Sequence, residues 1–101
     1  MGLLDLLMGK KVYLSDDLKA GAKVIDVRTA SEFQGGHVKD SINIPLNTIE
    51  ANVDKIKNMN CKIIFCCASG NRSGQANSMM KQKGVDCMNG GSWLSMNSYE
   101  L

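Results

Sequence analysis

The fold of this chain is decided by residues 61–73, Cys-Lys-Ile-Ile-Phe-Cys-Cys-Ala-Ser-Gly-Asn-Arg-Ser. Residues 61–66 form an apolar run that is too continuous to leave one face of a strand in water, which indicates a central strand of a parallel sheet. A loop rich in Gly, Ser and Asn follows at 68–71. From about residue 72 to residue 83, apolar side chains recur at helical spacing, and Gly84 follows as a C-terminal cap. The stretch therefore predicts a strand, a tight loop and a helix.

The flanking segments repeat this alternation of strands and helices. We expect strands at 23–27, 41–45 and 85–88 and helical segments near 16–20, 31–34 and 48–58. Residues 89–91 follow the last strand and lead into a closing helix around Trp93. Such an order predicts a small α/β domain with a mostly parallel central sheet and helices on both faces.

Size and charge narrow the classes of function. A chain of 101 residues has room for a single domain, residues 1–101. Its net charge of +2 and the absence of a dense basic stripe argue against a nucleic-acid partner. No apolar run approaches the ~20 residues that cross a bilayer, so we expect no membrane partner. Residues 1–11 place Asp5 inside their apolar part and both lysines after it, which favours a short N-terminal helix or extension over a secretory signal.

The chain has four cysteines, Cys61, Cys66, Cys67 and Cys87. A structural zinc site needs two short-spaced pairs of ligands, which these positions do not supply, so we expect no metal. Vicinal Cys66 and Cys67 in a strand point to opposite faces, which suits neither zinc nor a relaxed disulfide. Free thiols favour a reducing compartment, the cytoplasm, although the mature form of an exported protein stays open.

The loop after the central strand is the predicted site of chemistry. In open α/β sheets, ligands bind beyond the carboxyl ends of the strands. The amides of this loop and the first amides of the following helix face one point, where they stabilise an anion. Cys67 supplies that anion as a thiolate, because a helix N-terminus lowers the pKa of a thiol. We therefore predict that Cys67 is a nucleophile.

Residues 67–73 resemble the active-site loop of the single-domain rhodaneses, a family of sulfurtransferases. Three further stretches resemble motifs of the same family, in the same order. These are Asp26-Val27-Arg28 with Glu32-Phe33, then Gly36-His37-Val38 through Asn43-Ile44-Pro45, and finally Asn89-Gly90-Gly91 with Trp93. The resemblance covers about residues 12–96 and implies a rhodanese-like fold.

The resemblance also implies a reaction. Cys67 would take a sulfane sulfur from thiosulfate, a polysulfide or a persulfide donor, and would pass it from the resulting persulfide to cyanide or a thiol. No cofactor is implied. The partners would be a small sulfur donor and a thiol acceptor such as a small redox protein. The amides of the loop would bind the persulfide. The implied substrate-binding residues are therefore Ala68, Ser69, Gly70, Asn71, Arg72 and Ser73.

Two other functions stay open. Related cysteine phosphatases use a loop of the form C-x5-R, and counting from Cys66 to Arg72 gives that length. Counting from Cys67 gives C-x4-R, the length of the sulfurtransferases, and Cys66 is predicted to end the strand. The second alternative is a non-catalytic domain that binds a partner protein.

The remaining polar and aromatic residues have structural interpretations. His37 belongs to a structural turn in the family, and Trp93 is a packing anchor. Asp26 is expected to be a buried acid, and Arg28 to pair with Glu32 or a backbone carbonyl. Arg72 either contacts an anionic substrate or pairs with an acid such as Glu32, which we favour.

One departure from the family pattern concerns the choice of donor. Ala68 stands where many members of the family carry Arg or Lys, so the mouth of the site lacks that cation. This difference favours a persulfide or polysulfide donor over the thiosulfate dianion.

Overall fold

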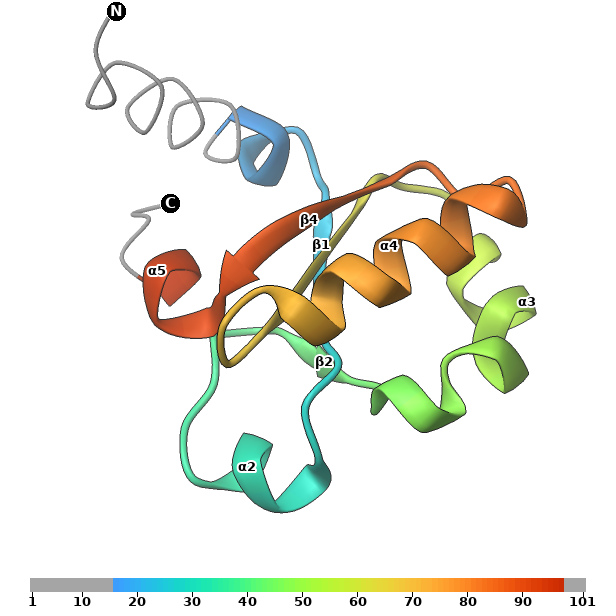
Figure 1. Ribbon diagram of the computed structural model, residues 1–101. Coiled ribbons are helices and arrows are strands. Elements are labelled where there is room, and N and C mark those ends of the chain that lie inside the picture. Colours follow the sequence, from blue (N-terminus) through green and yellow to red (C-terminus); the bar gives the residue numbers. More distant parts are fainter. Residues whose placement is uncertain (1–15, 98–101) are drawn as a thin grey trace, which may run out of the picture.

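A parallel four-stranded sheet organises residues 16–97, the part of the chain that this computed structural model describes (Figure 1). The strands are β1 (Lys23–Asp26), β2 (Ile42–Asn43), β3 (Ile63–Cys67) and β4 (Cys87–Ser92), in the spatial order β2-β1-β3-β4. All residues of β3 are buried and β3 lies between β1 and β4, which confirms the predicted central strand. The helix or extension expected at residues 1–11 lies outside the described residues.

Helices cover both faces of the sheet. Residues 16–19 are helical, as predicted. The labelled helical elements are α2 (Ala30–Gln34), the 3-10 turns η1 (Leu46–Thr48) and η2 (Glu50–Asn52), α3 (Val53–Lys57), α4 (Asn71–Gln82) and α5 (Trp93–Asn97). On one face, Ile56 of α3 and Met80 of α4 belong to the main core. On the other face, Met96 of α5 packs in a smaller core. The predicted α/β architecture is confirmed, and all strand pairs are parallel.

The side-chain alternation of β3 separates the two vicinal cysteines, as predicted. Cys67 belongs to the main core, beneath α4. Cys66 belongs to the smaller core on the opposite face, with Val24 and Met96. Both residues are fully buried.

Two predicted elements differ from the structure. The segment 48–58 begins as 3-10 turns, and Asn52, the last residue of η2, with φ −105° and ψ 13°, is the N-cap of α3. The last strand, predicted at 85–88, begins at Cys87 and continues through residues 89–91 to Ser92. Phe65 pairs with Asn89 and Cys66 with Gly91, so Gly90 is the extra residue of a β-bulge.

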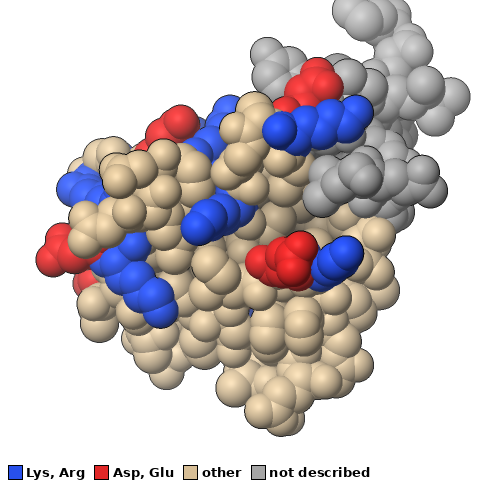
Figure 2. Space-filling view, turned by 180° about the vertical axis from the view of Figure 1, so that it is seen from behind, with Lys and Arg blue, Asp and Glu red and all other residues tan. Residues whose placement is uncertain are grey.

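Charged side chains are unevenly distributed over the face turned away in Figure 1. Figure 2 shows basic and acidic side chains interspersed over its upper part, above a largely uncharged lower part. Within residues 16–97, no helix has both the length and the apolar character required to cross a membrane.

Candidate active site

Cys67 lies at the carboxyl end of the sheet, where β3 passes into α4. It is the last residue of β3, paired with Ser92 of β4, rather than the first residue of the loop. The helix begins at Asn71, one residue earlier than predicted. The connecting loop is therefore only residues 68–70, and it brings the first amides of α4 close to the Cys67 side chain.

The tightness of this loop depends on Gly70. Its φ of +97° is left-handed, which a residue with a Cβ adopts at a cost. A Cβ at this position would also lie 3.3 Å from the Cα atom of Gly91 on β4. Glycine therefore lets the loop turn back onto the neighbouring strand before α4 begins.

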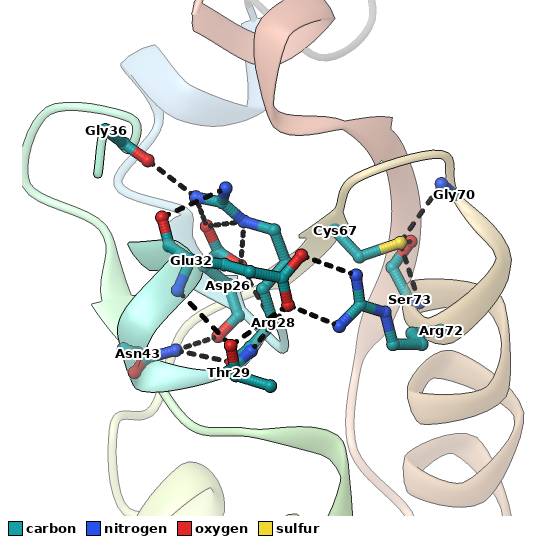
Figure 3. A network of polar contacts seen from close by, with 10 residues as sticks. All are labelled: Asp26, Arg28, Thr29, Glu32, Gly36, Asn43, Cys67, Gly70, Arg72 and Ser73. Carbon is teal, nitrogen blue, oxygen red and sulfur yellow. Dashed lines mark hydrogen bonds and ion pairs between the residues drawn. The ribbon is translucent and has the colours of Figure 1, made fainter. Parts of the chain in front are cut away.

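Amide and hydroxyl groups converge on the Cys67 sulfur (Figure 3). The amide of Gly70 donates to Sγ at 3.0 Å, and the amide of Ser73 donates at 3.4 Å. The Ser73 hydroxyl lies 3.3 Å from Sγ, and either group can be the donor in that contact. The sulfur thus accepts from two fixed amide donors, although the residue has no exposed surface.

Asn89 of β4 fixes the group that contacts the sulfur. Its Oδ1 accepts the Ser73 hydroxyl at 2.7 Å and the amide of Gly91 at 3.0 Å. Its Nδ2 donates to the carbonyl of Gly70 at 3.0 Å. One side chain therefore holds the loop, the helix start and the bulge of β4 together. Sequence reasoning placed Asn89 in a motif but missed this role, because the contact joins residues on different elements.

The pKa values of the two vicinal thiols are shifted in opposite directions. Burial alone raises the pKa of Cys67, but the hydroxyl and amide of Ser73 and the amides of Ser69 and Gly70 outweigh it, so the pKa is lowered overall. Burial, followed by the negative charge of Asp26, raises the pKa of Cys66 to about 12. Cys67 is therefore the more acidic of the two thiols, and Cys66 stays protonated at neutral pH.

A buried ion pair between Arg28 and Asp26 holds the segment that contains α2. The guanidinium of Arg28 donates to the carboxylate of Asp26 at 2.7 Å, and both side chains are almost fully buried. Arg28 also donates to the carbonyl of Gly36 at 2.7 Å and stacks over the Trp93 ring at 4.6 Å. The expected bond to a backbone carbonyl is confirmed. This pair fastens the segment that carries α2.

Arg72 pairs with Glu32 of α2, as we favoured. Its two terminal nitrogens donate to the two carboxylate oxygens at 2.7 and 3.0 Å. Hydrogen bonding to Arg72 is the main reason why the pKa of Glu32 falls to about 2. The pair links the start of α4 to α2, on the side of the loop next to Cys67 (Figure 3).

The other predicted site residues lie around the sulfur without a hydrogen bond to it from their side chains. Ala68, Ser69 and Asn71 are exposed on the loop and at the start of α4. His37 is also exposed; its ring stacks on Phe33 at 3.7 Å, and its Nδ1 lies 2.7 Å from the Phe33 carbonyl. This geometry suits the structural turn expected for His37. Among residues 16–97, no three His, Cys, Asp or Glu side chains are grouped as metal ligands.

Comparison with known sequences assigns the family. A sequence model of the rhodanese-like domain matches residues 10–93. The chain belongs to the rhodanese-like domain family. An uncharacterized protein of Bacillus subtilis, YqhL, is 31% identical over 77 residues, which are 73% of this chain and 60% of YqhL. The thiosulfate sulfurtransferase PspE of Escherichia coli is 33% identical over 61 residues, 59% of either chain.

A solved rhodanese supports the fold as well. The crystal structure of a rhodanese-related protein from Thermoplasma volcanium is 29% identical and superimposes with a TM-score of 0.74, covering 89% of this chain and 91% of that one. Against the curated relatives YqhL and PspE, the chain spans about three-fifths of their length.

Proposed function

We propose that this rhodanese-like domain is a sulfurtransferase that carries sulfur on Cys67. The observation that carries the proposal is the convergence of the Gly70 and Ser73 amides and the Ser73 hydroxyl on one buried sulfur. The two amides are fixed before reaction, so they stabilise a thiolate, or a persulfide anion, without a cost of reorganisation. Similarity to a thiosulfate sulfurtransferase adds support.

The proposed reaction has two steps. The Cys67 thiolate attacks the sulfane sulfur of thiosulfate, a polysulfide or a persulfide, and the donor leaves with the electron pair of its broken S–S bond. An acceptor thiolate or cyanide then attacks the outer sulfur of the Cys67 persulfide, which restores the thiolate. This ping-pong scheme needs no cofactor. The partners would be a small donor and a thiol acceptor such as a small redox protein.

The outer sulfur would lie over the loop, residues 68–73. We propose that the amides of Ala68 to Ser73 surround it and that these residues form the binding site for the donor. The four free thiols suit a reducing compartment, so we propose the cytoplasm as the location.

Intact-mass analysis after incubation with a sulfur donor tests the proposal. Wild type and Cys66→Ala should gain the mass of one sulfur atom, and cyanide should remove it as thiocyanate. Cys67→Ala should gain none. Cys66→Ala is the matched control, because it removes a buried thiol from the adjacent position. An unmodified wild type would contradict sulfur transfer and favour the binding domain.

The phosphatase alternative has a separate outcome. Hydrolysis of an aryl phosphate that is lost in Cys66→Ala and retained in Cys67→Ala would assign the chemistry to the other cysteine. The position of Cys66 in the core on the opposite face of the sheet argues against this result.

A further inference from the structure

The loop of the proposed site has one basic residue, and its charge is already neutralised. Within residues 67–73, only Arg72 is basic. Both of its terminal nitrogens are bonded to Glu32, and the side chains of Arg72 and Glu32 are 33% and 37% exposed. The pair therefore lies at the rim of the site, where solvent and a donor can reach it.

Glu32 is held in place independently of Arg72. The carboxylate Oε1 accepts the amide of Thr29 at 3.1 Å, and the Thr29 hydroxyl accepts the amide of Glu32 at 3.2 Å. This reciprocal pattern is a capping box at the start of α2. Because the helix cap orients the carboxylate, the carboxylate can hold Arg72 without a further ordering step.

Arg72 also lies within electrostatic reach of the sulfur. Its positive charge and an ionised Cys67 attract each other, and Figure 3 shows its guanidinium on the side of the loop next to Cys67. Without Glu32, Arg72 would be an unpaired cation beside the position where a donor must approach. With Glu32, the pair has no net charge.

The charge of the donor then determines how readily it reacts. Attack on thiosulfate joins a thiolate to a dianion, giving a Cys67 persulfide anion and sulfite, so three negative charges meet. Attack on a protonated persulfide, R–S–SH, gives a protonated Cys67 persulfide and the thiolate RS⁻, so one negative charge is present throughout. An unpaired cation at the rim lowers the first barrier far more than the second.

We propose that Glu32 is a specificity-determining residue, which cancels the charge of Arg72 and thereby directs the site to neutral persulfides rather than to dianionic thiosulfate. This inference rests on the proposed function and names its class of donor. The absence of a cation at Ala68 already disfavours thiosulfate. The new inference assigns a further part of the donor preference to Glu32, an acid on α2 outside the loop.

Glu32→Gln tests the inference, because glutamine keeps the capping box and removes the charge. We expect kcat/KM for thiosulfate to rise about fivefold and that for an arenethiosulfonate monoanion about twofold, since the Coulomb energy scales with the charge of the donor. Glu50→Gln, on the exposed turn η2, removes the same charge elsewhere and should change neither value. The double variant Glu32→Gln/Arg72→Gln should lose the gain.

Alkylation of Cys67 provides a readout that does not require sulfur transfer. The ratio of the rates with iodoacetate, an anion, and iodoacetamide, which is neutral, should rise about twofold in Glu32→Gln alone. An unchanged ratio overturns the inference, and so does a rise that survives in the double variant. If the ratio rises but no donor sulfurates the wild type, the proposed function fails while the electrostatic role of Glu32 stands.

Discussion

Replacing Ser73 with alanine should raise the pKa of Cys67 by about one unit. In the thiolate, the Ser73 hydroxyl can donate to Sγ across 3.3 Å, but it then gives up its bond of 2.7 Å to Asn89. A hydrogen bond to a charged group is worth about 1.5–3 kcal/mol and one between neutral groups about 1 kcal/mol. The difference, about 0.5–2 kcal/mol, brackets the roughly 1.4 kcal/mol that corresponds to one pKa unit. Donors favour the charged form, so removing one raises the pKa.

The rate at which iodoacetamide alkylates Cys67 in Ser73→Ala should be lower than in wild type at low pH and higher at alkaline pH. Below both pKa values, the thiolate fraction of Ser73→Ala falls about tenfold, while each thiolate becomes about threefold more nucleophilic. The observed rate should therefore fall about threefold at low pH and exceed wild type about threefold on the alkaline plateau. General damage to the site would lower the rate at every pH.

Ser69→Ala is the matched control for this prediction. Ser69 contributes its amide to the lowered pKa of Cys67, and its side chain is exposed, so the amide survives the substitution. The midpoint of the pH profile, followed by peptide mass analysis of Cys67, should not move. An equal shift in both variants, or no shift in Ser73→Ala, would refute the role assigned to the hydroxyl.

Three further predictions address donor choice and stability. Ala68→Arg should raise kcat/KM for thiosulfate, and an unchanged or lower value would remove the electrostatic explanation. The pKa of Glu32 falls from 4.5 to about 2 through Arg72, so the stability from their pair is present above pH 4.5 and is lost as pH falls toward 2. The free energy of unfolding of Glu32→Gln, measured in urea, should then equal that of wild type near pH 2 and be lower than that of wild type at pH 7. Gly90→Ala should destabilise the domain by about 1–3 kcal/mol in the same assay, because its Cβ would lie 2.7 Å from Ile64 Cγ2; wild-type stability would contradict this packing.

The sequence predicts those parts of the site that follow from local pattern. The apolar run up to Cys66 identifies the central strand, and its period of two separates Cys66 from Cys67. The Gly and Asn residues after Cys67 mark a tight loop. Arg72 and Glu32 were also matched correctly, because an arginine near a carboxylate favours bidentate pairing.

The missed features depend on which segments become neighbours. Asn89 reaches Ser73 only because β4 pairs with β3, with Phe65 opposite Asn89. The bulge that carries β4 through Gly90 also depends on that register, whereas the sequence predicts a strand that ends at Met88. No local pattern gives either result, since both require the strand order.

The contrast between Cys66 and Cys67 shows how the surroundings of a buried thiol change its acidity. Both side chains are fully buried in the same strand, and burial raises the pKa of each. Only Cys67 faces α4, where the Gly70 and Ser73 amides donate to it. The same burial strengthens these hydrogen bonds, because water does not compete for the donors, and together they outweigh the direct effect of burial on the pKa. The opposite face offers Cys66 the negative charge of Asp26, which opposes ionisation. The face of β3 on which a cysteine lies therefore decides whether the pKa of its thiol is lowered or raised.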